Sequence, residues 1–160
     1  MQYVSVEHQK AIAPKYRVAA IIVTAIALSV ILFIIMGKIM NPGEPALESE
    51  IWQKRIYGGV LVLGLIIVVL RRFLMSGAAM SRAAAGGVSN VLRNLLTVTV
   101  IISALAEFIA ILGLFFYLRT GDNQYSWRLG VVSLFLLIYA FPRRGEWERV
   151  VTASVEAQKK

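Results

Sequence analysis

The chain has 160 residues, of which 58% are hydrophobic and 16% charged, and it carries a net charge of +8 and no cysteine. Soluble domains are typically about 45–50% apolar and about 25% charged, and a soluble protein of this size buries too little surface for such a composition. The composition therefore favours a membrane protein. With no cysteine and a single histidine, disulfides, iron–sulfur clusters and His-based metal or haem sites are excluded or disfavoured, and we expect no cofactor.

The first apolar segment covers residues 18–37 and contains no charged residue. A helix rises about 1.5 Å per residue, so about 20 residues cross a hydrocarbon core of about 30 Å. Lys10, Lys15 and Arg17 precede the segment, as basic residues do in a secretory signal peptide. The segment exceeds the apolar region of a signal peptide, about 7–15 residues, and ends without a small-residue cleavage site. We therefore predict a retained transmembrane helix.

The second apolar segment, residues 56–70, is short for a span. Trp52 and Tyr57 are of the types that settle among lipid headgroups, and the long stem of Lys54 can reach the interface. We predict a span at about 52–70. A buried helix or a half-span is the alternative for a segment of this length.

The third apolar segment, residues 95–118, is interrupted only by Glu107. The fourth, residues 129–141, is short, and Trp127 provides an interfacial anchor before it. We predict the last span at about 126–142. The half-span alternative applies to this segment as well.

Together these segments predict an all-α, integral membrane four-helix bundle. The divisions are an N-terminal segment 1–17, a membrane domain 18–142 that includes a basic loop 71–94, and a C-terminal tail 143–160. Lysine and arginine number twelve on the side of the termini and the basic loop, and five on the other side. Because basic residues favour the cytoplasmic side, we expect cytoplasmic N- and C-termini in a multi-pass protein of a bacterial inner or plasma membrane.

The basic side is expected to contact lipid headgroups or a partner protein. The candidate contact residues are six arginines: Arg71, Arg72, Arg82, Arg93, Arg143 and Arg144. Topology and attraction to anionic lipid explain the positive charge. No nucleic-acid-binding motif accompanies it, so we expect no nucleic acid partner. An ordinary basic connector is the alternative interpretation of the loop.

Residues 73–94 within this loop are rich in glycine and alanine. This composition predicts a short interfacial helix followed by a break at Gly86 and Gly87. Ser89 or Asn90 is then the expected cap of the third span.

Glu107 lies near the middle of the third predicted span. An ionised acid at that depth costs about 2.5–3.5 kcal/mol, so we expect Glu107 to face protein or water and to be protonatable. Thr99 and Ser103 precede it at intervals of four residues and share its helix face. The candidate hydrogen-bond partners are hydroxyl groups: Thr24, Ser29, Thr99, Ser103 and Ser133. A proton-binding site and a structural hydrogen bond between helices both fit this pattern.

A neighbouring face of the same span carries small residues at Ala106, Ala110 and Gly113. Small residues let two helices approach closely in a membrane, where no hydrophobic effect drives helices together. We therefore expect this stripe to be a helix-packing surface.

Residues 104–114 read Ala-Leu-Ala-Glu-Phe-Ile-Ala-Ile-Leu-Gly-Leu. This stretch resembles the carboxylate-bearing helix of the proteolipid c subunit of rotary ATPases, where a sequence such as A-L-A-E-A-I-A-I-Y-G-L surrounds the ion-carrying glutamate. Phe108 and Leu112 depart from that pattern. The resemblance is local, since the alternating glycines of the family's first helix are missing from residues 56–70. It implies that Glu107 carries a proton.

No nucleophile–base pair, phosphate loop or metal set is present, so we do not expect an enzyme, although the chain could belong to an enzyme complex. The leading hypothesis is a structural or accessory subunit of a larger membrane assembly, with other membrane subunits or copies of itself as partners. The alternative is proton translocation through Glu107, in a rotary-ring-like protein or a small oligomeric channel or transporter.

The predicted topology can be tested with reporter fusions. A fusion at position 160 should report the cytoplasm, and a fusion in the 39–50 loop should report the opposite side, because twelve of the seventeen basic residues lie on the side of the termini. A C-terminal reporter on the outer side would contradict an even number of spans.

Overall fold

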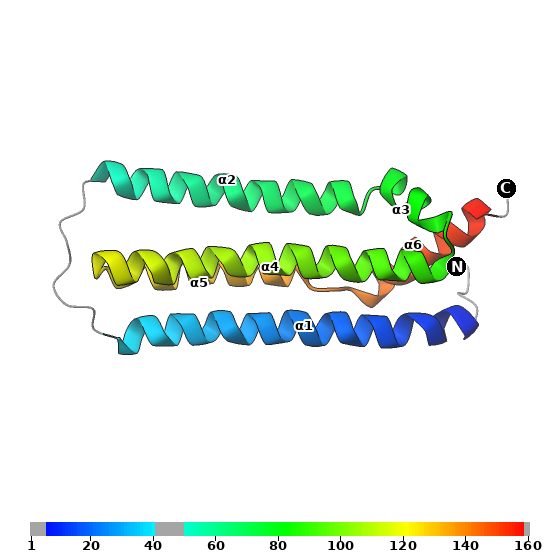
Figure 1. The fold of residues 1–160 in the computed structure, drawn as a ribbon, viewed down its shortest axis with the longest axis horizontal. Helices are drawn as coiled ribbons and strands as arrows, with labels where there is room; N and C mark the ends of the chain where they lie inside the picture. The colour runs from blue at the N-terminus through cyan, green and yellow to red at the C-terminus, as the bar shows by residue number, and fades with distance from the viewer. Residues whose placement is uncertain (1–5, 41–49, 159–160) are drawn as a thin grey trace.

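The computed structural model describes residues 6–40 and 50–158, so the predicted segments 1–17 and 143–160 are described only from residue 6 and up to residue 158. Its helices are α1 (Val6–Ile39), α2 (Glu50–Leu74), α3 (Gly77–Ala84), α4 (Val88–Thr120), α5 (Asn123–Ala140) and α6 (Arg144–Gln158). Helices α1, α2, α4 and α5 run side by side, and α3 and α6 lie at the end where α1 begins (Figure 1). The described residues contain no strand, which confirms the predicted all-α class.

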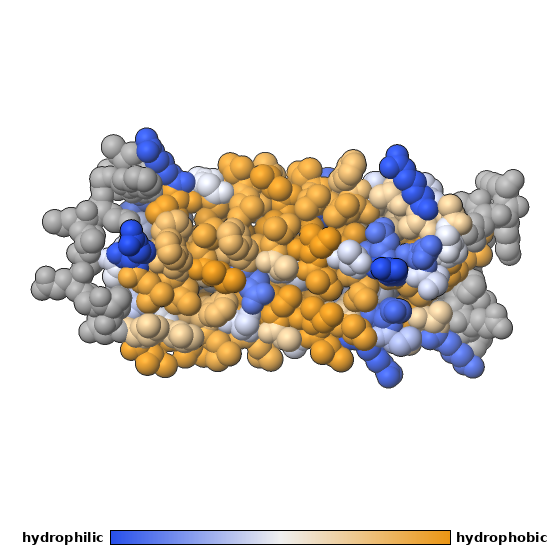
Figure 2. All heavy atoms as spheres, viewed as in Figure 1, coloured by the Kyte–Doolittle hydropathy of each residue, from blue (hydrophilic) through white to orange (hydrophobic). Residues whose placement is uncertain are grey.

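Three helices are long and apolar enough to cross a membrane, and their qualifying stretches are 10–39, 53–74 and 88–120. Helix α5 qualifies only together with α6, as a pair bent by 43°, which gives up to four spans. On the face shown in Figure 2, apolar residues form a broad band across the middle, and hydrophilic residues gather towards the two ends. These features are those of a multi-pass membrane protein.

Helix α4 is the central element of the fold. It contacts all five other helices, and 44% of its most apolar stretch is buried within the chain, compared with 17% for α1 and 11% for α2. Helices α1 and α2 therefore direct most of their apolar side chains outwards, as lipid-facing helices do.

Small residues allow α5 to approach both α4 and α1 closely. A Cβ atom added at Gly113 of α4 would lie 2.8 Å from Leu129 Cβ and 2.9 Å from the Tyr125 carbonyl oxygen of α5. A Cβ atom added at Gly130 of α5 would overlap the side chain of Ile34 on α1. Through these two contacts α5 packs against both α4 and α1, at distances that a larger side chain at either glycine would prevent.

Serine hydroxyls of α5 reinforce the same contacts. Ser133 Oγ donates a hydrogen bond of 2.6 Å to the Ala106 carbonyl of α4, and Ser126 Oγ donates one of 3.3 Å to the Phe33 carbonyl of α1. Both serines are buried. A serine hydroxyl in a helix can also bond a carbonyl of its own helix, but here both hydroxyls bond carbonyls of neighbouring helices, and these bonds favour one register of α5.

A tight turn connects α4 to α5. Gly121 adopts the left-handed conformation at φ 75° and donates its backbone N–H to the Tyr117 carbonyl at 2.8 Å. The Asp122 carboxylate then accepts a hydrogen bond of 2.9 Å from the backbone N–H of Gln124 and caps α5. The end of one helix and the start of the next are thereby both satisfied within a few residues.

The basic loop folds as predicted in outline, with one correction. Helix α3 is the short helix expected in this region, and the chain breaks at Gly86 and Gly87. The expected cap at Ser89 or Asn90 is wrong, because α4 already begins at Val88. Gly87 occupies the cap at φ 85°, a conformation that residues with a side chain rarely adopt.

Helix α6 contributes to an apolar cluster at the end of the molecule where α1 begins. The sequence predicted only a tail for these residues. Trp147 and Val151 of α6 are buried against Ile12 of α1, Met80 of α3 and Leu95 of α4. The Tyr16 ring meets the Trp147 ring edge-on at 6.0 Å. Four helices therefore converge on one cluster beside the ends of the apolar helices.

The close approach at Gly113 predicts a strong dependence on side-chain size. Gly113→Leu should lower the free energy of unfolding by about 1–3 kcal/mol, because the new side chain overlaps α5. Gly59→Leu on α2 is the matched control, since a Cβ atom there would meet nothing within 4 Å. Unfolding in detergent measures both variants, and equal stability would contradict the packing described for α4 and α5.

Candidate functional site

Glu107 lies near the middle of α4 and is paired across the helix interface with α1. The Ser29 hydroxyl of α1 donates a hydrogen bond to Glu107 Oε1. Ser29 Oγ also lies 2.8 Å from the carbonyl oxygen of Ile26, one turn earlier on α1. No described residue forms an ion pair with Glu107. The carboxyl group is thus held by a neutral, polar neighbour.

The Ser29 hydroxyl lies within hydrogen-bond distance of two acceptor oxygens, Glu107 Oε1 and the Ile26 carbonyl. A hydroxyl has one hydrogen to donate and lone pairs that accept. When Glu107 is ionised, Ser29 can donate to it. When Glu107 is protonated, Ser29 can donate to Ile26 and accept the proton of the acid. The geometry therefore accommodates both protonation states of Glu107 without moving a helix.

The other predicted members of this site do not bond to Glu107. Thr99 Oγ1 donates to the Leu95 carbonyl of its own helix at 2.8 Å. Ser103 is fully buried, and its hydroxyl has no hydrogen-bond partner among the described residues. Of the candidate hydroxyls, Ser29 is the one that meets the carboxyl group, whereas Thr24 is exposed. The spacing along one helix could not reveal the partner, because that partner comes from another helix.

The small residues of α4 are covered by helices of the same chain. Ala106 and Ala110 are fully buried and belong to a cluster with Val23 of α1 and Leu137 of α5. Gly113 faces α5, as described above. This stripe is therefore occupied by contacts within the chain and is not free for a second subunit.

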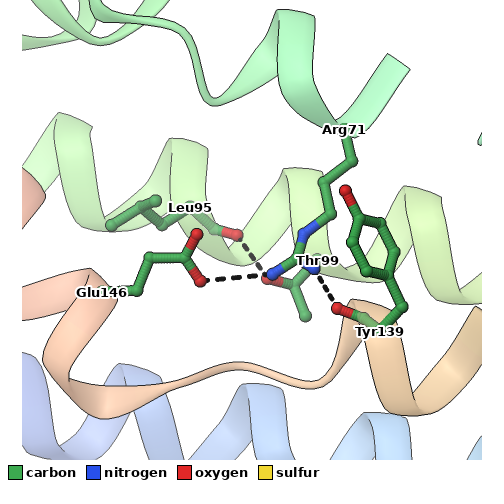
Figure 3. A network of polar contacts seen from close by, with 5 residues as sticks. All are labelled: Arg71, Leu95, Thr99, Tyr139 and Glu146. Atoms are coloured by element: carbon green, nitrogen blue, oxygen red, sulfur yellow. Dashed lines mark hydrogen bonds and ion pairs between the residues drawn. The ribbon is translucent and has the colours of Figure 1, made fainter. Parts of the chain in front are cut away.

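The six predicted arginines occupy different environments, and Arg71 is the most buried of those in ion pairs. Arg71 extends from the last turn of α2 and donates to the Tyr139 carbonyl and to Glu146 Oε2, the latter at 3.2 Å (Figure 3). Its guanidinium also lies 4.5 Å from the centre of the Tyr139 ring. The side chain is only 11% exposed. Arg71 thereby satisfies a carbonyl at the end of α5 and ties it to the start of α6.

Arg71 also lines an open cleft of about 630 Å³ between α2, the end of α5 and the start of α6. Arg72 and Arg143 line the same cleft, together with Arg149. Arg149 was missed by sequence reasoning because α6 was expected to be a tail. The spacing of Trp147, Val151 and Ser154 on one helix face was the available signal for α6.

The remaining predicted arginines lie outside the cleft. Arg144 pairs with Glu148 one turn later on α6 at 2.9 Å, and both groups are partly open to solvent. Arg82 and Arg93 are exposed and do not line the cleft. The predicted basic surface is therefore divided into a built cleft and separate surface charges.

Comparison with known proteins adds no function to these sites. No family model, no curated protein and no solved structure matches the chain. Among residues 6–40 and 50–158, no three histidine, cysteine, aspartate or glutamate side chains lie together as a metal site requires.

Proposed function

We propose that the chain is a small, non-enzymatic, four-span membrane protein that serves as a structural or accessory subunit of a larger membrane assembly. Helix α5 is the fourth span in this proposal: its 18 residues cover about 27 Å, close to the thickness of the hydrocarbon core. Both termini are cytoplasmic, and the membrane is a bacterial inner or plasma membrane. The arginines beside α3 and α6 support this orientation.

The loose attachment of α2 carries the proposal that there is a partner. Only 11% of its most apolar stretch is buried by the rest of the chain, and it packs less extensively on α4 than α1 and α5 do. Gly58 and Gly59 lie on it with open space where a side chain would be. Exposed backbone of this kind allows close approach by another transmembrane helix. A helix of a neighbouring subunit is the proposed occupant, and the assembly can itself be an enzyme complex.

Site-specific photo-crosslinking in native membranes tests the proposal. A photoreactive residue at Leu61 on α2 should give a discrete adduct with one other membrane polypeptide, and Gly59→Leu should abolish that adduct. The same probe at Ile21 on α1 is the matched control, since the two side chains are 71% and 68% exposed. Equal labelling of lipid from both positions, with no protein adduct, would contradict the proposal. An adduct with a second copy of the chain would show a homo-oligomer.

A second function, proton translocation through Glu107, is favoured by the Ser29 contact. The pair accommodates both the charged and the neutral acid, which a proton carrier requires. The local resemblance to the c subunit of rotary ATPases is a further reason to consider it. The channel, transporter and rotary-ring forms of this hypothesis all place the proton on Glu107.

Substitution of Glu107 separates the structural and proton-carrying roles. Glu107→Gln keeps an oxygen that can accept from Ser29, so the variant should fold and assemble, whereas Glu107→Ala should lose about 0.5–1.5 kcal/mol of stability with the partly buried hydrogen bond. Proton flux is then measured in reconstituted vesicles, together with carbodiimide labelling of the wild type at several pH values. A proton carrier should lose flux in the Gln variant. Normal flux in that variant would eliminate the proton-carrier hypothesis.

A further inference from the structure

The arginine-lined cleft has the charge and size of a site for an anion. It holds Arg71, Arg72, Arg143 and Arg149 against the single carboxylate of Glu146, which leaves a net charge of +3 on its walls. Its volume of about 630 Å³ lies within the range of small-molecule pockets, roughly 300–1,000 Å³. The cleft is thus large enough for a phosphate-bearing headgroup.

Three of the four arginines are available to a ligand. Arg71 is engaged with Glu146 and the Tyr139 carbonyl. Arg72, Arg143 and Arg149 form no ion pair with any carboxylate of the described residues. Guanidinium groups bind phosphate oxygens through paired, charge-assisted hydrogen bonds. Arg71 therefore fixes the wall of the cleft, and the other three provide donors.

The backbone adds to this attraction for anions. The cleft includes Gly145 in the first turn of α6, where the helix terminus carries partial positive charge. The N–H groups of Glu146 and Trp147 are bonded to the Arg143 carbonyl, so the Gly145 N–H is the donor of this turn that lines the cleft. A Cβ atom at Gly145 would meet nothing within 4 Å, so a ligand can approach the backbone at this point. The site thus combines side-chain cations with a helix terminus.

An apolar groove lies between α2 and α5, further along both helices from the cleft. The groove has a volume of about 580 Å³ and is lined by Gly64 of α2 and Leu136 of α5, among other residues. Arg71 follows Gly64 by seven residues, and Tyr139 follows Leu136 by three, so each pair shares one helix face. The cleft therefore lies about 10 Å further along α2 from Gly64, on the side that faces α5. A soluble anion such as inorganic phosphate has no apolar part that could occupy this groove.

We propose that the cleft binds the phosphate headgroup of an anionic lipid, one acyl chain of which lies in the groove between α2 and α5. A bound lipid would fill the space beside the loosely packed helix α2 and neutralise charge that the carboxylates of the described residues leave unpaired. Basic pockets between transmembrane helices have the chemistry that anionic headgroups require. The headgroup cleft stands independently of the function proposed above, because it uses neither Glu107 nor Gly58, Gly59 and Leu61 of α2.

Native mass spectrometry of delipidated full-length protein in detergent tests the lipid site. Titration with phosphatidylglycerol should give one retained lipid per chain, whereas phosphatidylcholine should not be retained. Arg72→Gln combined with Arg143→Gln should weaken phosphatidylglycerol binding roughly thirtyfold. Arg82→Gln combined with Arg93→Gln removes the same charge outside the cleft and should leave binding within about twofold of the wild type. Equal weakening in the two double variants would overturn the site.

Two further arms of the experiment identify the ligand. Gly64→Leu places a large side chain in the groove and should weaken lipid binding although every arginine of the cleft is still present. Inorganic phosphate at about 10 mM should not displace the lipid, because it gains nothing from the groove. Displacement by phosphate, together with normal binding in Gly64→Leu, would show a free-phosphate site and overturn the lipid proposal. Thermal unfolding of every variant confirms that the fold is retained before binding is compared.

Discussion

The close approach of α5 to α4 at Gly113 is the contact on which the rest of the structure depends. Apolar side chains are as well solvated by lipid as by each other, so helices associate in a membrane through close packing and interhelical hydrogen bonds. Gly113 allows the close packing, and the bond from Ser133 to the Ala106 carbonyl is an interhelical hydrogen bond. Helix α1 then packs against the surface that these two helices form. Because α2 lacks comparable contacts with the others, it remains the most exposed of the long helices.

The surroundings of Glu107 follow from the packing of α1 against α4. Helix α1 lies against α4 through Val23, Val30 and the small residues Ala106 and Ala110, and that contact places Ser29 opposite the carboxyl group. An unpartnered acid in hydrocarbon is costly, so the hydroxyl contributes to holding α1 in its register. Ser29 is a neutral partner, and a hydroxyl can either donate to a carboxyl group or accept from it. Packing and the chemistry of the proposed proton site are therefore not independent.

The apolar helices were readable from the sequence because membrane thickness sets the number of apolar residues that a span needs. The all-α class and the glycine break after α3 follow from the same local rules. The contact of Ser29 with Glu107 was one of several alternatives, since a side-chain pair between helices depends on their rotation, which hydropathy does not encode. Helix α6 was missed because its charged residues resemble a solvated tail, and its buried face is defined only by the cluster around Trp147. The arginine cleft was out of reach for the same reason, since Arg149 and Glu146 belong to α6.

The backbone bends between α5 and α6 beside Arg71, whose guanidinium bonds to a residue on each side of the bend. A helix that ends leaves carbonyl groups without partners, and near hydrocarbon water cannot satisfy all of them. Arg71 donates to one of these carbonyls from a neighbouring helix and uses its second nitrogen for Glu146, so the bend is stabilised by a charge that α2 supplies. Helix α2, which packs loosely along its length, is thereby fixed at this end by a polar contact. Two separate openings remain beside α2, the arginine-lined cleft near this polar contact and the apolar groove between α2 and α5 further along the helices.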